Sequence, residues 1–252
     1  MKKTGFVLSV LLFAGFGAMA QQEDPAEMKP QMTEIWDPEV RLVTPGKTPQ
    51  DAPSDAIILF DGIDLESEWT SADGSKPGWK VEDGCITVVK GAGTIKTKRV
   101  FEDFQLHIEW RSPEEVTGKS QGRGNSGVFL QERYEVQVLD SYDNRTYRNG
   151  QAGSIYKQHA PLVNVTKEPG KWQTYDIIYT APRFNDDGSY FTPPVITVLH
   201  NGVLVQNHSK VRGPTVFIGI PEYHVKPHGP GSIVLQDHGN PVSFKNIWIR
   251  EL

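Results

Sequence analysis

The chain has 252 residues, of which 37% are hydrophobic, 10% aromatic and 23% charged, with 24 Gly and 18 Pro. This composition excludes a disordered, collagenous or multi-span membrane protein and suits one large globular domain or two small ones. Lys and Arg number 26 against 31 Asp and Glu, a net charge of −5, which excludes the basic surface with which proteins bind nucleic acid. The single cysteine, Cys85, excludes an intramolecular disulfide and a Cys-rich zinc site.

The first twenty residues have the order of a secretory signal. Lys2 and Lys3 precede an apolar run that closes on the small-residue segment 18–20, and the run is too short to span a bilayer comfortably. We therefore expect residues 1–20 to be a signal peptide cleaved near Ala20, with the protein exported to the periplasm or the extracellular space. A retained N-terminal anchor is the alternative.

Residues 21–54 contain six prolines and show little periodicity, which is typical of an extended arm. Ile35, Trp36 and Val40 suggest that part of this arm docks on the domain that follows. From 55 to 252 the sequence changes to short apolar runs separated by Gly, Asn, Asp and Pro, and we expect one domain there.

The apolar runs alternate with a period of two, the pattern of half-buried strands. Strands are expected at 57–60, 79–81, 85–89, 94–98, 104–111, 126–131, 134–138, 172–180, 195–199, 203–206, 233–236 and 243–250. Asp83-Gly84 and Asn201-Gly202 are dipeptides that two-residue hairpins favour, because both central residues need positive φ. No long stretch has apolar residues at helical spacing, so the sequence predicts an all-β protein, an antiparallel β-sandwich or jelly roll.

Polar groups occupy the free faces of several predicted strands. Glu109 and Arg111 lie near the end of one strand, and Asn125 stands between glycines that let the backbone approach a ligand. Gln236 and His238 follow an apolar run, and an imidazole there is a candidate proton carrier. For each of these patterns the simpler interpretation is a solvated strand face or an ordinary polar loop.

The segment from Tyr134 to Asp140 carries the densest polar pattern. Glu135 and Gln137 share one strand face, with Asp140 at or past the strand end, and such groups serve proton transfer and hydroxyl recognition. The spacing is similar to the E-x-D-x-x-E strand of laminarinase-type β-glucanases. Gln137 replaces the central acid, however, which argues against a retaining mechanism, since that needs two carboxyl groups about 5–5.5 Å apart.

Acidic loop residues are the one source of metal ligands that the sequence offers. They could supply oxygen ligands to Ca²⁺, but their spacing is not that of an EF-hand, and solvated loop acids are the simpler explanation. We predict no metal and no cofactor. The residues are Asp140, Asp143, Asp186 and Asp187.

Several long strings, in order along the chain, resemble the 3-keto-disaccharide hydrolase domain family, which is abundant in exported proteins of Bacteroidetes. The strings are FDGIDL (60–65), WKVEDGCITV (79–88), DFQLHIEWR (103–111), GNSGVFLQ (124–131), YEVQVLDS (134–141), WQTYDIIYTAPRF (172–184) and LQDHGNPVSFKNIWIREL (235–252). The resemblance covers roughly residues 55–252. It implies a concanavalin A-like β-sandwich and a hydrolase that cleaves sugars oxidised at the 3-position, with an upstream sugar 3-oxidoreductase as a partner that supplies its substrate.

Chemistry on a 3-keto sugar needs a base at C2, because the ketone acidifies that hydrogen and the enolate then expels the C1 substituent. We expect Glu135 or His238 to be the base, and Glu109 or the other member of that pair to protonate the leaving group. Other residues are expected to hold the substrate: Arg111, Asn125, Gln137, Asp140, Tyr156 and Gln236.

Two alternatives stay open at this point. One is a lectin-like module that binds carbohydrate without cleaving it, since β-sandwiches of this kind serve both purposes. The other is a conventional two-carboxylate β-glucanase. Trp69, Tyr156 and Tyr223 would stack on sugar rings in every case, so they do not discriminate. The sequence leaves the oligomeric state open.

Overall fold

The computed structural model of the chain describes residues 29–223 and 225–252, so the predicted signal peptide 1–20 lies outside the described residues. The chain divides into two units, Met1–Leu42 and Val43–Leu252. In the described part of the first unit, a single 3-10 turn, η1 (Pro30–Thr33), stands in otherwise extended chain. Ile35, Trp36 and Val40 of this unit are exposed, and the docking expected of them stays a prediction.

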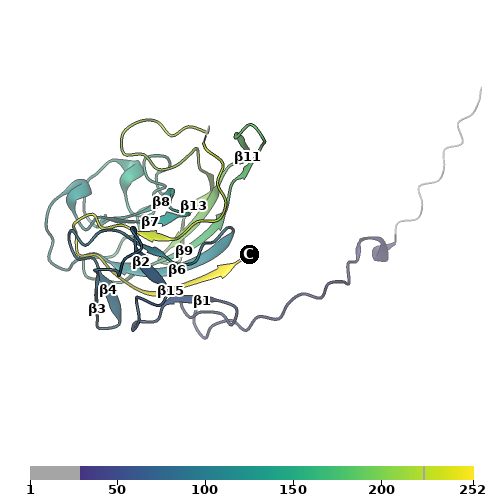
Figure 1. Cartoon of the computed structure of the whole chain (residues 1–252), viewed down its shortest axis with the longest axis horizontal. Coiled ribbons are helices and arrows are strands. Elements are labelled where there is room, and N and C mark those ends of the chain that lie inside the picture. The colour runs from purple at the N-terminus through teal and green to yellow at the C-terminus, as the bar shows by residue number, and fades with distance from the viewer. Residues whose placement is uncertain (1–28, 224) are drawn as a thin grey trace, which may run out of the picture. The chain divides into compact units, whose positions relative to one another are not determined.

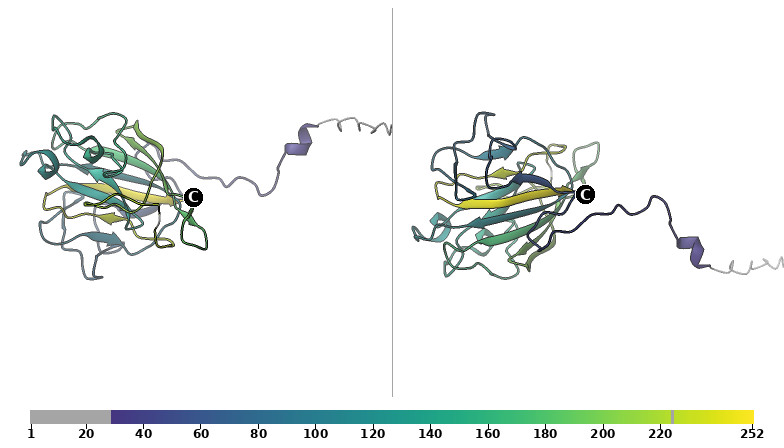
Figure 2. Two further views of the ribbon diagram at one scale, coloured as in Figure 1. Left: turned by 90° about the horizontal axis from the view of Figure 1, so that it is seen from above. Right: turned by 90° about the horizontal axis from the view of Figure 1, so that it is seen from below.

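The strands of the second unit form two antiparallel sheets. Each sheet buries one face in the core, as antiparallel sheets with alternating sequences commonly do. The large sheet has the order β13-β12-β9-β6-β15-β4-β3, with β1 also paired to β15, and the small sheet has the order β2-β5-β14-β7-β8. Figure 1 labels most of these strands, and Figure 2 shows the sheets from above and below. A separate hairpin joins β10 (Arg183–Phe184) and β11 (Tyr190–Thr192).

The bounds of the strands follow the alternation in the sequence. The large sheet contains β1 (Ile57–Phe60), β3 (Lys80–Glu82), β4 (Cys85–Thr87), β6 (Phe104–Arg111), β9 (Gln173–Thr180), β12 (Val195–His200), β13 (Val203–Lys210) and β15 (Ser243–Glu251). The small sheet contains β2 (Trp69–Ser71), β5 (Ile95–Thr97), β7 (Ser126–Leu130), β8 (Tyr134–Val138) and β14 (Val234–Leu235). Two further 3-10 turns are η2 (Ser120–Gly122) and η3 (Arg148–Gly150).

The apolar core lies between the two sheets. In β6 the residues Phe104, Leu106, Ile108 and Trp110 are fully buried, which is the face that the alternation predicts. Tyrosines of the large sheet also bond to the small-sheet side of the sandwich: the hydroxyl of Tyr175 donates to the carbonyl oxygen of Gln137 at 2.8 Å. The predicted all-β sandwich of two antiparallel sheets is confirmed.

Both predicted hairpin turns have the backbone that their residues favour. Asp83 and Gly84 have φ of 51° and 71°, and Asn201 and Gly202 have φ of 52° and 77°. Strands β2, β10 and β11 were not expected. Trp69, on β2, is fully buried with its indole N–H donating to the carbonyl oxygen of Leu59 at 2.7 Å, so its predicted role on a sugar-binding surface is wrong.

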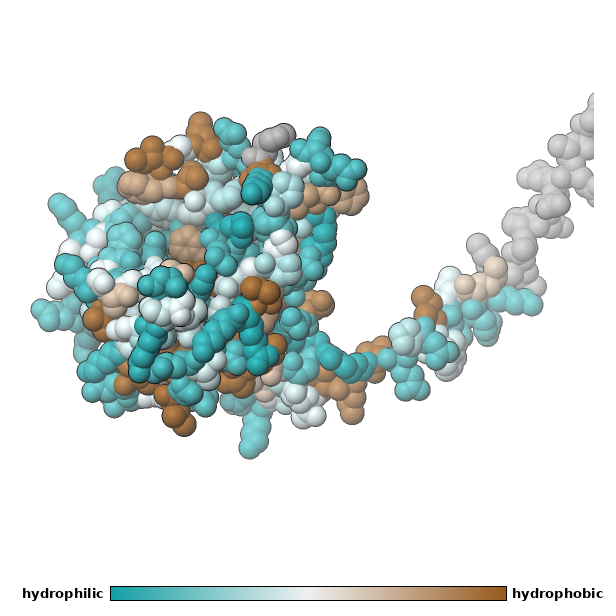
Figure 3. All heavy atoms as spheres, in the orientation of Figure 1, coloured by the Kyte–Doolittle hydropathy of each residue, from teal (hydrophilic) through white to brown (hydrophobic). Residues whose placement is uncertain are grey.

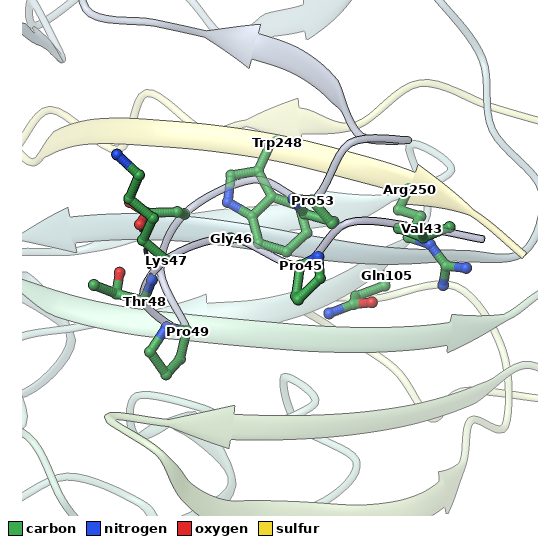
Figure 4. Close-up of a pocket in the computed structure, with 11 residues that line it drawn as sticks. Val43, Pro45, Gly46, Lys47, Thr48, Pro49, Pro53, Gln105, Trp248 and Arg250 are labelled. Atoms are coloured by element: carbon green, nitrogen blue, oxygen red, sulfur yellow. Dashed lines mark hydrogen bonds between the residues drawn. The ribbon is translucent and has the colours of Figure 1, made fainter.

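A strap of residues 43–55 belongs to the second unit and covers the outer face of the large sheet. The carbonyl oxygen of Gln50 accepts hydrogen bonds from Asn246 Nδ2 and Trp248 Nε1, both at 3.0 Å. Asp55 pairs with Arg250 at 2.7 Å. In Figure 4 the indole of Trp248 extends from β15 toward the strap. This cover explains why Trp248 is buried on a face that would otherwise meet solvent.

Within residues 29–223 and 225–252, no helix has the length and apolar character that crossing a membrane requires.

Candidate active site

A row of groove-facing side chains crosses the small sheet where β14, β7 and β8 lie side by side. Phe129 pairs with Glu135, and Gly127 pairs with Gln137 across the β7–β8 ladder. On the other side of β7, the backbone N–H of Gln236 donates to the carbonyl oxygen of Gly127 at 3.1 Å. Because Gly127 has no side chain, the middle of the row is hollow.

Glu135 lies over this hollow. A Cβ placed on Gly127 would come within 2.6 Å of Glu135 Oε1 and 3.0 Å of Phe129 Cε2, so the carboxyl group occupies the space that glycine leaves. The backbone of Glu135 is held on both sides: its N–H donates to Thr215 Oγ1 at 3.0 Å, and its carbonyl oxygen accepts from the N–H of Tyr156 at 3.1 Å.

The carboxyl group of Glu135 is in a dry place. Only 4% of the residue is exposed, and burial raises its pKa to about 8 because a low-dielectric surrounding penalises the charged form. A carboxyl group with such a pKa changes its proton near neutral pH, which suits a general acid or base.

Amide groups line the floor beside Glu135. Gln137 Nε2 donates to Asn125 Oδ1 at 3.2 Å and to Gln121 Oε1 at 3.3 Å, which fixes the orientation of the amide. The Oε1 atoms of Gln137 and Gln236 are buried and have no partner. Such acceptors are costly to leave unpaired, and a hydroxyl-bearing ligand would satisfy them.

The groove has two adjoining compartments. The polar compartment, of about 240 Å³, is lined by Asn125, Phe129, Glu135, Gln137, Tyr156, Thr215, Phe217, Gln236 and His238. The aromatic compartment, of about 550 Å³, is lined by Gln121, Gly122, Asn125, Tyr147, Tyr156, Lys157, Phe217 and His238. Four residues line both compartments and mark the boundary between them: Asn125, Tyr156, Phe217 and His238.

His238 is exposed and stands on a turn that neighbouring loops hold in place. Asp237 Oδ2 accepts the backbone N–H groups of Gly91 at 2.8 Å and Gly93 at 3.1 Å, and Oδ1 accepts that of Gly239 at 2.8 Å. The turn is therefore fixed although the imidazole is accessible, a combination that suits proton exchange with a ligand and with water.

The structure thus brings six of the nine predicted site residues to one groove: Glu135, His238, Asn125, Gln137, Tyr156 and Gln236. Asp140 lies outside it and is 1% exposed, with Oδ2 accepting from Arg123 Nε at 2.6 Å. Asp140 therefore closes a loop and does not face either compartment. Tyr223 also lies outside the groove, with its ring centroid 6.3 Å from that of Tyr190.

Glu109 and Arg111 lie on the outer face of the large sheet, away from this groove. Arg111 stacks over Trp172 at 4.7 Å. Burial alone would raise the pKa of Glu109, but bonds to His107 and Asn246 and the nearby Lys245 lower it to about 2. The carboxylate of Glu109 is thus held ionised in a polar cluster under the strap.

His107 is the buried centre of that cluster. Burial alone would lower its pKa, but bonds to Asp176, at 2.7 Å, and to Glu109 raise it. The ring also stacks on Trp248 at 5.1 Å. This arrangement fastens strands β6, β9 and β15 together, and its imidazole is fully buried, so no ligand reaches it.

Sequence reasoning missed the walls of the groove. They come from loops far apart in the chain, at Gln121, Tyr147, Lys157, Thr215 and Phe217. Strand alternation carries no signal for such loops; the only hint is the apolar string at 216–220 in an otherwise Pro- and Gly-rich segment.

No group of three or more His, Cys, Asp or Glu side chains in the described part of the chain is arranged to hold a metal ion.

The chain is similar to proteins of known sequence and structure. The model of the 3-keto-alpha-glucoside-1,2-lyase-like domain matches residues 55–250. A 3-keto-disaccharide hydrolase of Bacteroides thetaiotaomicron is 25% identical over an alignment of 237 residues, with 78% of each chain covered. A solved structure from Parabacteroides distasonis, provisionally assigned as a glycosyl hydrolase, is 54% identical with a TM-score of 0.85, over 91% of this chain and 99% of that one. Another from the same organism, 23% identical with a TM-score of 0.57 over 79% and 94% of the two chains, shares the fold.

Proposed function

Because the chain belongs to the 3-keto-alpha-glucoside-1,2-lyase-like family, we propose that it cleaves 3-keto-glucosides or 3-keto-disaccharides by elimination across C1 and C2, followed by addition of water. The family membership confirms the resemblance identified from the sequence. The named activity of the Bacteroides relative supports the same substrate class.

One observation carries the proposal. Among the described residues that line the two compartments, Glu135 is the only carboxylic acid. A conventional glycosidase needs two, about 5–5.5 Å apart for retention or about 6.5–9.5 Å apart for inversion. Elimination from a 3-keto sugar needs one strong base and no carboxylate nucleophile, which is what this groove offers.

The proposed reaction uses two proton carriers, one that accepts the C2 hydrogen and one that protonates the leaving oxygen. Glu135 takes the hydrogen from C2, and the electron pair forms an enolate with the C3 oxygen. The enolate collapses to restore the C3 ketone and form the C1–C2 double bond while the C1–O bond breaks. The departing oxygen takes a proton from His238, and water then adds across the double bond to give the free 3-keto sugar.

The remaining groups bind and orient. Gln137 presents an acceptor, because both hydrogens of its amide face Asn125 and Gln121, so it holds a sugar hydroxyl and not the keto oxygen. Gln236 carries the other unpartnered acceptor, and its amide nitrogen is the donor that we assign to the developing enolate oxygen. Tyr156 walls the site at the boundary of the compartments.

The test is a paired assay of the protein with 3-keto-trehalose and with unoxidised trehalose, following released monosaccharide with time. Cleavage of the oxidised sugar alone, with incorporation of solvent deuterium at C2, is the expected result. Cleavage of both sugars at similar rates would overturn the elimination route. Binding without turnover would make the protein a carbohydrate-binding module.

We also propose that the protein acts after export and downstream of a sugar 3-oxidoreductase. Segment 1–20 supports export, and the need for an oxidised substrate supports the partner. Sequencing the N-terminus of protein recovered from the periplasm and the medium tests the first point, with Gln21 expected as the first residue.

A further inference from the structure

The two compartments of the groove differ in the state of their polar atoms. In the polar compartment, the Oε1 atoms of Gln137 and Gln236 are buried without a partner. In the aromatic compartment, the hydroxyls of Tyr147 and Tyr156 bond to each other at 2.6 Å, and the Lys157 ammonium donates to the carbonyl oxygen of Phe217. Hydroxyl-rich ligand groups therefore find unpaired acceptors in the first compartment, and in the second they find polar atoms that already have a protein partner.

The amide of Gln121, which lines the aromatic compartment, is also paired. Gln121 Nε2 donates to Thr146 Oγ1 at 2.9 Å and to the carbonyl oxygen of Gly150 at 2.8 Å. Its Oε1 accepts from Gln137 at 3.3 Å. The polar atoms that a second sugar ring would meet here already have protein partners, so the ring would gain less from hydrogen bonding here than in the polar compartment.

Aromatic faces are what this compartment offers instead. The Lys157 ammonium lies 4.4 Å from the ring centroid of Phe217 and 5.9 Å from the centroids of both Tyr147 and Tyr156, which gathers the three rings around one cation. Phe217 is nevertheless 70% exposed, and Ile218 beside it is 86% exposed. In Figure 3 hydrophobic residues, coloured brown, gather over the yellow-green loop at the top of Figure 1. Exposed apolar groups of this kind mark binding surfaces.

The boundary between the compartments is where the scissile bond belongs. His238, the assigned acid for the leaving oxygen, lines both of them, while Glu135 lines only the polar one. With the keto sugar over Glu135, the group attached to its C1 oxygen therefore extends past His238 and Tyr156 into the aromatic compartment.

Resting on the proposed function, we propose that the aromatic compartment is a leaving-group subsite for an aromatic aglycone, so that 3-keto-glucosides of aromatic alcohols are better substrates than 3-keto-disaccharides. Phe217 and Tyr147 are the specificity-determining residues. The Lys157 cation among the rings favours flat π systems and aglycones that bear negative charge.

The experiment compares benzyl 3-keto-α-glucoside with 3-keto-trehalose in the full-length protein. The leaving oxygen of trehalose is a hemiacetal hydroxyl, which departs more easily than benzyl alcohol, so a preference for the benzyl substrate reports the subsite and not the ease of departure. We expect the benzyl substrate to be preferred, and Phe217→Ala to reduce that preference about tenfold, mainly through KM. Phe191→Ala is the matched control, because Phe191 is an exposed phenylalanine on β11 that lines neither compartment.

Equal efficiency with the two substrates, or a preference that survives Phe217→Ala, would overturn the subsite while leaving the proposed function intact. If the protein cleaves neither ketone, the proposed function fails, and binding then decides the subsite. Calorimetry with unoxidised benzyl α-glucoside and trehalose gives that answer: tighter binding of the benzyl compound that is lost in Phe217→Ala supports the subsite, and equal binding refutes it.

Discussion

At the scale of a single residue, the proposed elimination depends on keeping one carboxyl group dry. A glutamate side chain in water is ionised at neutral pH. Burial by the strand and the loops around Glu135 raises the pKa of its carboxyl group to about 8. A carboxylate that gains its proton so readily is a stronger base than a solvated one. Removing a hydrogen from carbon needs that strength.

The pH dependence follows from this value. We expect the pH profile of kcat/KM on a 3-keto substrate to contain a limb that rises with pH up to about 8, because only ionised Glu135 can accept the C2 hydrogen. Glu135→Gln should lower turnover by about 10²–10⁴-fold and leave the protein folded. Glu132→Gln, which changes an exposed acid three residues away, is the control. A profile with no rising limb below pH 8 would contradict the role of base.

The same group makes stability depend on pH with a definite sign. Its pKa is higher in the folded state than the 4.5 of the free side chain, so the folded protein holds the proton more tightly. The contribution of Glu135 to stability is greatest below pH 4.5 and decreases by about 1.4 kcal/mol per unit as pH rises toward 8. Urea unfolding of the wild type and Glu135→Gln across this range should show the variant gaining relative stability, with no further gain above pH 8.

At the scale of the element, the site depends on one strand pair in which a glycine faces an acid. β7 and β8 place Gly127 between Gln236 and Gln137, and the carboxyl group of Glu135 lies over the gap. The alternation in the sequence is enough to predict these strands and the shared face of Glu135 and Gln137. It says nothing of Gly127, because a glycine in a strand reads equally as a weak point or as a bulge.

Substituting Gly127 tests this geometry. In Gly127→Ala the new Cβ would lie 2.6 Å from Glu135 Oε1, so the carboxyl group must move. We expect kcat/KM to fall at least tenfold, with a loss of stability of about 1–3 kcal/mol from crowding. Gly229→Ala serves as the control, since nothing lies within 4 Å of a Cβ there. Wild-type kinetics in Gly127→Ala would show that the carboxyl position is not critical.

The sequence predicted the strands better than the site. Glu109 and Glu135 both stand on alternating strands with polar neighbours, and the pattern cannot tell which sheet each strand joins. The structure places them on different sheets, one under the strap and the other in the groove. Phe217 and Lys157 were missed because their place depends on loop closure over long separations, which local pattern does not encode.

At the scale of the whole second unit, the two sheets divide the work. The small sheet carries the groove, and the outer face of the large sheet carries a charged cluster under the strap, where Glu109 bonds to Asn246 at 2.9 Å and faces Lys245 at 3.4 Å. The cluster is stabilising, since Glu109 is held ionised. The apolar core lies between the two faces, so changes on one face should be felt weakly on the other.

Glu109→Gln tests this separation. The pKa of Glu109 is lowered to about 2 in the folded state, so its contribution to stability is present above pH 4.5 and is lost as pH falls toward 2. At pH 7 we expect a loss of about 1–3 kcal/mol, reduced by solvent around the partly exposed Lys245, with kcat/KM within about twofold of wild type. In the double variant with Glu135→Gln, the two free-energy changes should add within about 0.5 kcal/mol. A catalytic loss in Glu109→Gln without a stability loss, or strong non-additivity, would show that the outer face acts on the groove.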